Sequence, residues 1–332
     1  MLTEYKLAIK NSQPYKLGIA KLLLSPEIGI LIPLIILCIF TGLLNPRFLT
    51  WLNFSVILRY ATFMATITIG QAFVIMTGEI DLSVGANAGF SGIIFGLGAI
   101  TWGLHPVIAI ALAIMAGAAI GFVNGYLVAS YGVVNFISTL ATMFICIGLQ
   151  ITLSGGKSIS PLPEEYVNFS TQKPLSLSWV FFIMLGILII SEIIIRFTRT
   201  GRMIQGVGGN KEAALMAGIN VKKVKWGVYI LSGALAGVAG ILASIDASAA
   251  SSEFGPGLEF KTITACAVGG ISLLGGSGSI LGVGVGILLI NVLSNSLQYL
   301  KVESNWQLVI IGLILILAVF FDILKKKIDS KN

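Results

Sequence analysis

Ten apolar stretches, most of them long enough to cross a membrane as helices, constrain the fold of this 332-residue chain. A helix needs about 20 apolar residues to span the hydrocarbon core, and two of the stretches, 62–77 and 262–276, are shorter and run into glycine-rich or charged turns. We therefore expect an all-α polytopic membrane protein with about ten transmembrane helices, two of them short or broken. The stretches lie at residues 28–44, 62–77, 84–104, 106–130, 133–153, 175–195, 226–245, 262–276, 279–300 and 305–321.

Composition and charge agree with that class. Hydrophobic residues make up 56% of the chain and charged residues 11%, and the mean hydropathy is +0.97, a profile that a helix bundle in lipid requires. With the N-terminus in the cytoplasm and ten crossings, fifteen of the 21 basic residues fall on the cytoplasmic side, as the positive-inside rule predicts. The net charge of +7 is therefore a topology signal, and we expect lipid as a partner and no nucleic acid.

The same reasoning gives the predicted organisation of the chain. Residues 1–27 form a cytoplasmic segment, 28–322 a single transmembrane domain and 323–332 a cytoplasmic tail. Within the domain, 154–174 is the longest external loop and 197–225 is a cytoplasmic loop.

Glycines spaced four residues apart predict close helix packing. Lipid supplies no hydrophobic drive between helices, so small residues that let backbones approach hold such bundles together. The predicted contact glycines are Gly85, Gly89, Gly92, Gly96, Gly117, Gly121, Gly125, Gly233, Gly237, Gly282 and Gly286.

The segment Gly78–Gly85, GEIDLSVG, places two carboxylates between apolar stretches. Ionisable residues near membrane depth are costly, so they face water, find partners or cap helices. Asp81 is expected to be the N-cap of the following helix, because its carboxylate can accept from first-turn amides; contact with a transported solute is the alternative. Ser83 and Gly85 belong to the same turn, and Glu79 fits a cytoplasmic surface better.

A later segment repeats the pattern of this turn. Gly269–Gly276, GGISLLGG, shares the spacing Gly-x-Ile-x-Leu-x-x-Gly. Broken helices at matching positions of two halves are typical of transporters built by internal duplication. Chance similarity between glycine-rich apolar stretches is the competing interpretation.

A polar and basic island, Gly201–Lys225, lies between two long apolar stretches. Within it, Glu212, Ala213, Ala214 and Gly218 form E-A-A-x-x-x-G, which resembles the coupling loop by which permease subunits of ATP-binding-cassette (ABC) importers dock on their ATPases. We expect Glu212–Gly218 to form a short helix that contacts an ATPase, and the coupling site also to include Gly209 and Asn210.

Further blocks extend the resemblance over nearly the whole chain. GEIDLSVG is similar to the signature of ribose-type, monosaccharide-importing ABC permeases, in the branched-chain amino acid/ribose permease superfamily. Residues 45–50, NPRFLT, residues 136–142, FISTLAT, and residues 267–282, AVGGISLLGGSGSILG, match in the same order. The family usually carries Gly where this chain has Glu79.

The resemblance implies an assembly and a fold. The expected partners are an ABC ATPase, an extracytoplasmic sugar-binding protein and a second permease copy, identical or related. The expected fold is that of vitamin-B12-type, or type II, importer permeases, in the plasma (inner) membrane of a bacterium or archaeon. ATP and Mg would be bound by the partner ATPase, and this chain would hold no cofactor.

The chain itself shows no catalytic or metal-binding pattern. One histidine and three widely separated cysteines provide neither a zinc site nor a histidine-based catalytic group. Residues 156–158, GKS, imitate the end of a P-loop, but position 151 is Ile where the first glycine is required. We therefore expect a transport subunit that is not an enzyme.

For the solute pathway, polar side chains inside apolar stretches are the candidates. Asn291 and Asn295, at i and i+4, share one helical face. Bonding across helices is their alternative role. Two other functions stay open: an ABC permease for another small polar solute, such as a nucleoside or branched-chain amino acid, and an ion-coupled secondary transporter.

Overall fold

The computed structural model describes residues 26–171 and 177–329. Within these ranges the chain is helical, and its single β pairing is an isolated bridge between Ile159 and Ala250. The elements are α3 Pro26–Leu44, η1 Pro46–Leu49, α4 Trp51–Met76, α5 Val84–Gly96, η2 Leu97–Thr101, α6 Pro106–Tyr131, α7 Asn135–Ser154, α8 Glu164–Thr171, α9 Trp179–Phe197, α10 Arg199–Gly209, α11 Lys211–Met216, α12 Val221–Ala247, α13 Leu258–Val268, α14 Ile280–Tyr299 and α15 Ser304–Asp329.

Seven described helices are long and apolar enough to cross a membrane, namely α4, α5 continued by η2, α6, α7, α9, α12 and α14. Shorter apolar segments, Ile30–Leu44 and Asn305–Phe320, lie in α3 and α15. The predicted all-α, polytopic fold is confirmed, and the total of ten crossings remains a prediction. Most of the predicted segment 1–27, residues 172–174 of the predicted external loop and the last three residues of the predicted tail lie outside the described residues.

The expectation of a short or broken helix at 62–77 is wrong. α4 is one helix of 26 residues that begins at Trp51. Its first half contains Asn53, Ser55 and Arg59, which lower the local hydropathy without interrupting the helix. Thr50 caps its N-terminus by accepting from Asn53 N at 3.4 Å.

The stretch 262–276 is broken, as expected. α13 is an 11-residue helix that ends at Val268. The chain then turns through Gly270 at φ +84° and Gly275 at φ +85°, a conformation that residues with a Cβ rarely adopt. This turn connects α13 to α14.

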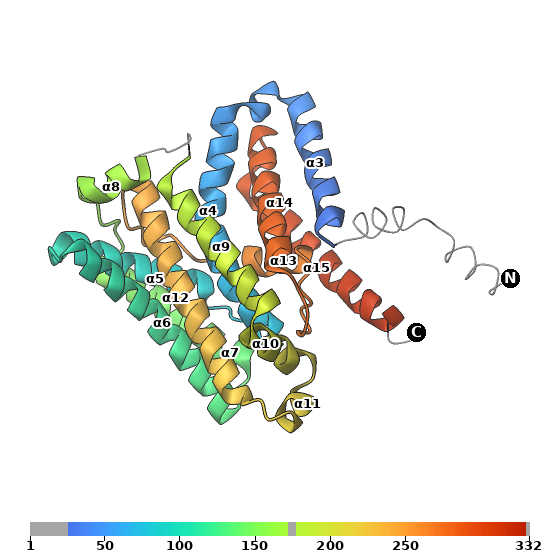
Figure 1. Cartoon of the computed structure of the whole chain (residues 1–332). Helices are drawn as coiled ribbons and strands as arrows, with labels where there is room; N and C mark the ends of the chain where they lie inside the picture. The colour runs from blue at the N-terminus through green and yellow to red at the C-terminus, as the bar shows by residue number, and fades with distance from the viewer. Residues whose placement is uncertain (1–25, 172–176, 330–332) are drawn as a thin grey trace.

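α12 runs through the middle of the bundle, where it packs against α6, α4 and α5 (Figure 1). The crossing of α6 and α12 depends on glycine. A Cβ at Gly121 would overlap the carbonyl oxygen of Tyr229, and one at Gly233 would overlap that of Gly117. All eleven glycines predicted to sit at close contacts have neighbouring atoms that a Cβ would crowd. Three of them, Gly85, Gly89 and Gly96, lie against the non-helical segment between α12 and α13, and the predicted close packing of helices is confirmed for the others.

Candidate functional site

The α10–α11 hook, residues 199–218, lies at the end of the bundle opposite α8 (Figure 1). Side chains cap both of its helices: Thr198 accepts from Gly201 N at 3.2 Å, and Asn210 accepts from Ala213 N at 2.9 Å. Gly218, at φ +76°, supplies the left-handed turn after α11. The short helix expected over 212–218 is therefore present as Lys211–Met216, because Asn210 caps it and Gly218 must lie beyond its end.

α11 is anchored on one face and open on the other. Ala214 is buried with Val207 of α10 and Val221 of α12, and a small side chain here lets the three helices approach. The exposed residues of α11 include Glu212, Ala213, Leu215 and Met216, the last of which is 90% exposed. An exposed apolar pair such as Leu215 and Met216, at the tip of a polar loop, is typical of a protein contact.

The C-terminal end of α10 is wedged between the two glycine-rich turns. Gly208 touches the end of α4, where a Cβ would overlap the Met76 carbonyl oxygen and lie 2.7 Å from Gly276 N. Gly276 N donates to that same carbonyl at 3.0 Å. A Cβ at Gly209 would be 3.8 Å from the Cα of Gly276. Backbone contacts thus join the α10–α11 hook to the turn after α4 and to the turn before α14.

Glu79 lies at this junction in an ion pair with Lys225 of α12, and both side chains are largely buried. The ion pair links the turn after α4 to α12, the helix that follows the α10–α11 hook. A surface position for Glu79 was expected from the sequence, but its carboxylate is mostly covered because Lys225 neutralises it. Partnering of this kind offsets part of the cost of removing a charge from water.

Asp81 is the start of a buried hydrogen-bond chain. It accepts from Ser83 N at 2.8 Å and from Ser83 Oγ at 2.6 Å. Ser83 in turn accepts from Asn124 Nδ2 at 2.9 Å, and Asn124 Oδ1 accepts from Thr142 Oγ1 at 2.9 Å and Ser138 Oγ at 3.2 Å. The formal N-cap of α5 is Ser83, so Asp81 holds the turn just before the helix instead of capping its first turn. This hydrogen-bond chain joins the turn before α5 to α6 and α7.

Burial raises the pKa of Asp81 to about 6, from an ordinary value of 3.8. A raised pKa in the folded state adds stability below the unfolded pKa, and this stability is lost as the pH rises through about 6. We expect the free energy of unfolding to fall by about 2 kcal/mol more in the wild type than in Asp81→Asn between pH 4.5 and 7.5. Denaturant unfolding in detergent measures this; parallel pH profiles would contradict it.

Gly85 lies in the first turn of α5 and allows the chain before α13 to approach. A Cβ there would overlap the carbonyl oxygen of Gly255 and lie 2.8 Å from the Glu259 Oε2 atom. The segment between α12 and α13 therefore reaches deep into the bundle at this point.

The two asparagines of α14 line one pocket but differ in their hydrogen-bond partners. Asn295 exchanges two hydrogen bonds with Asn53 of α4, at 2.9 and 3.0 Å, so its amide is engaged between helices. Asn291 lines a pocket with residues of α4 and α13, and its buried Nδ2 atom has no protein partner among the described residues. Asn295 lines the same pocket, as expected from the shared helical face, but of the two only Asn291 has an amide nitrogen that no described residue pairs with.

Two carboxylates bond to the turn between α13 and α14 and to the start of α14. Neither was predicted from the sequence as a site residue. Glu192 Oε2, from α9, accepts from Ile280 N at 2.9 Å and Leu281 N at 3.2 Å, which begin α14. Asp322, from α15, accepts from Ser272 Oγ at 3.1 Å and Leu273 N at 3.2 Å. A lone Glu inside the apolar stretch 175–195 was the available signal, because an ionisable residue there needs a partner.

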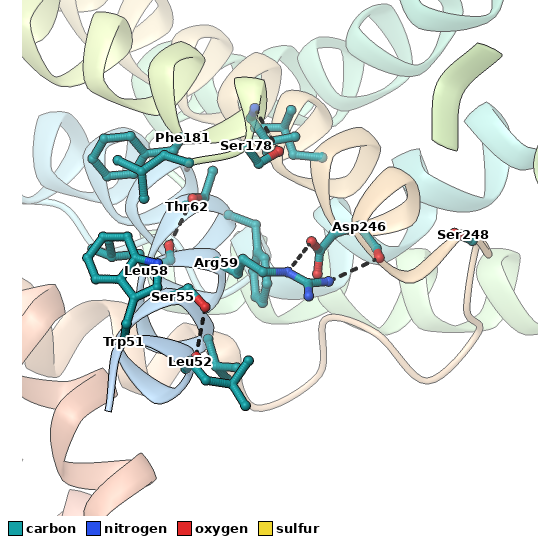
Figure 2. Close-up of a pocket in the computed structure, with 15 residues that line it drawn as sticks. Trp51, Leu52, Ser55, Leu58, Arg59, Thr62, Ser178, Phe181, Asp246 and Ser248 are labelled. Carbon is teal, nitrogen blue, oxygen red and sulfur yellow. Dashed lines mark hydrogen bonds and ion pairs between the residues drawn. The ribbon is translucent and has the colours of Figure 1, made fainter. Parts of the chain in front are cut away.

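A second feature lies at the opposite end of the bundle, in a pocket of about 490 Å³ between α4, α9 and α12. Figure 2 shows Arg59 reaching across this pocket to Asp246, with Ser178 just before α9 and Phe181 in its first turn. Arg59 Nε donates to Asp246 Oδ1 at 2.8 Å. Since the Arg59 side chain is 51% exposed, this ion pair contributes little stability and chiefly joins α4 to α12.

Among the described residues, no three side chains of His, Cys, Asp or Glu come together as metal ligands. His105, the single histidine, caps α6 by accepting from Val107 N at 3.4 Å.

An apolar helix bundle with an exposed helical hook defines a polytopic membrane protein. Residues 53–319 match the family model described as branched-chain amino acid transport system / permease component. The chain belongs to this family.

Curated relatives match over most of the chain. The ribose import permease protein RbsC of Bacillus subtilis is 37% identical over 298 residues, covering 89% of this chain and 92% of the relative. The L-arabinose ABC transporter permease protein AraH of Azospirillum brasilense is 34% identical, covering 89% and 86%. The D-allose transport system permease protein AlsC of Escherichia coli is 34% identical, covering 88% and 90%. A solved metal-chelate type ABC transporter in an inward-facing conformation aligns with a TM-score of 0.46 at 15% identity, covering 93% of this chain and 99% of that one.

Proposed function

We propose that this chain is the permease subunit of an ABC importer and forms the membrane pathway for a monosaccharide. An extracytoplasmic binding protein delivers the sugar, and a separate ATPase that binds ATP and Mg drives transport. Relatives named for ribose, arabinose and allose support the sugar class. The chain contributes docking and a pathway, and no catalytic step.

The observation that carries this proposal is the outward face of α11. Glu212, Leu215 and Met216 offer one charge and two apolar side chains to a partner. Behind these side chains, backbone contacts of Gly208 connect the α10–α11 hook to the turn after α4 and to the turn before α14. Movement of a docked ATPase would therefore be passed to the ends of α4 and α14 without an intervening flexible side chain.

Orientation and assembly follow from the same proposal. The α10–α11 hook and both termini face the cytoplasm of a bacterial or archaeal cell, and α8 faces outward. Two permease copies pair in the membrane, so that the ATPase contacts two hooks. The basic residues of 197–225 support this orientation through the positive-inside rule.

The proposal is tested by purifying the chain in detergent with the products of neighbouring genes. We expect an ATPase to co-purify and its ATP hydrolysis to rise when binding protein loaded with ribose, arabinose or allose is added. Stimulation by a branched-chain amino acid instead would assign another solute, as the family description allows. Absence of an ATPase together with uptake that follows an ion gradient would replace the proposal by a secondary transporter.

Glu212→Lys is expected to reduce ATPase co-purification at least tenfold. The side chain is exposed on the first turn of α11, where reversal of its charge opposes a docked partner and is also unfavourable beside a helix N-terminus. Glu164→Lys is the matched control, because that exposed glutamate lies on α8 at the other end of the bundle. Equal ATPase recovery with both variants would remove α11 from the interface.

A further inference from the structure

A polar pocket of about 310 Å³ lies between α4, α14 and the start of α13. Asn291 is near the middle of the 20-residue α14, and Tyr60 is in the central part of the 26-residue α4. The pocket therefore extends along α14 from its middle to Gln298, next to its last residue, and along Ile57 to Met64 of α4. Lys261, on the first turn of α13, lines the same pocket.

Lys261 has no ion-pair or hydrogen-bond partner within the described part of the chain. Asn291 Nδ2, which lines the same pocket, is likewise without a protein acceptor there. A cation within a membrane-spanning bundle is costly unless water or a ligand solvates it. Two donors without protein acceptors, one on α13 and one on α14, thus indicate a pocket that holds water or an oxygen-rich solute.

The other lining groups narrow the ligand class. Glu253 is exposed and also lines the pocket, so the formal charges of Glu253 and Lys261 sum to zero in the lining. Ser294 and Gln298 add groups that both donate and accept. Tyr60, 59% exposed, adds an aromatic face for an apolar ring surface. Mixed donors and acceptors beside an aromatic face suit an uncharged polyhydroxylated molecule.

The pocket is also unsuited to contact with lipid. Acyl chains would leave the ammonium of Lys261 and the amide of Gln298 without hydrogen-bond partners. The lining residues on α4 and α14, Ile57 to Met64 and Asn291 to Gln298, lie toward the ends of these helices that are remote from the two turns the α10–α11 hook contacts. α13 runs from the pocket to the turn before α14.

We propose that Lys261 and Asn291 are the paired donors of a solute-contact site in the permease itself, which holds the hydroxyl groups of a neutral sugar during its passage. This inference rests on the proposed function and adds the location and polarity of the site. Asn295 also lines the pocket but is not one of the paired donors, because its amide already bonds to Asn53.

The test uses the complete importer in proteoliposomes, with radiolabelled ribose, arabinose and allose and the cognate binding protein. The variants are Lys261→Met, Asn291→Leu and the double variant. We expect sugar uptake per ATP hydrolysed to fall at least tenfold in the double variant, with unchanged Tm, unchanged ATPase recovery and an unchanged KM for loaded binding protein. Uptake within twofold of wild type in the double variant would overturn the inference.

Two controls make the outcome specific. Lys301→Met removes an exposed lysine just beyond α14 that does not line the pocket, and it should leave uptake unchanged. Asn295→Leu breaks the pairing with Asn53 and should lower Tm, whereas Asn291→Leu should not. Failure of the proposed function is visible separately, since the wild-type assembly would then take up none of the three sugars.

Discussion

Gly208→Ala is expected to abolish transport and to lower the free energy of unfolding by about 3 kcal/mol or more, at the upper end of the usual cost of overpacking. The added methyl group would overlap the Met76 carbonyl oxygen and press on Gly276 N, 2.7 Å away. Both atoms belong to backbone and already bond to each other at 3.0 Å, so no side-chain rotation can make room. The α10–α11 hook would have to move away from both turns.

The matched control for this variant lies two residues earlier in the same helix. A Cβ at Gly206 would have its nearest neighbour, Ile219 Cδ1, at 3.8 Å, an ordinary contact distance. Gly206→Ala should therefore preserve transport and add about 0.5–1 kcal/mol of helix stability. Unfolding in detergent and sugar uptake measure both variants. Normal uptake by Gly208→Ala would show that the close packing at Met76 is dispensable for coupling.

Glu192→Ala is expected to cost about 3 kcal/mol of unfolding free energy and most of the transport activity. Its carboxylate accepts from two backbone amides that begin α14, and removal leaves the buried Ile280 N and the part-buried Leu281 N without this acceptor. Each hydrogen bond to a charged group contributes about 1.5–3 kcal/mol. Because the two bonds share one carboxylate oxygen, we expect their combined loss to lie near the upper end of this range. Glu192→Gln keeps an acceptor oxygen and should recover about half of the loss.

Arg196→Ala separates this role from the ion pair on the same helix. Arg196 Nη1 lies 3.6 Å from Glu192 Oε1, and the arginine side chain is 64% exposed. An exposed i,i+4 pair is worth about 0.3–0.5 kcal/mol, so this variant should remain close to wild type. If Arg196→Ala destabilised the chain as much as Glu192→Ala, the ion pair, and not the contact with α14, would explain the effect.

The turn between α4 and α5 contains contacts that could not be predicted from the sequence. The carboxylates of GEIDLSVG were recognised as unusual because ions near lipid need a partner. Their partners were not predictable, since Lys225 is 146 residues from Glu79 and Asn124 is 41 residues from Ser83. Only packing of α6 and α12 beside the turn brings these groups together.

Reasoning from local sequence alone was also insufficient for α4 and for Asn295. Helix formation at 51–61 does not require an apolar window, because side-chain capping at Thr50 and continued backbone hydrogen bonds sustain it. Asn295 seemed equivalent to Asn291 from helical periodicity alone. Periodicity places two residues on one face, but it does not say which of them meets another asparagine.

The sequence by itself determined the all-α membrane fold, the small-residue helix contacts and the family, because hydropathy, glycine spacing and ordered motifs are properties of the chain alone. The tertiary structure decided how Gly208 joins the α10–α11 hook to both turns, which carboxylates hold those turns, and that Lys261 and Asn291 share a pocket. These features depend on contacts between residues far apart in the chain, and such contacts exist only once the helices have packed.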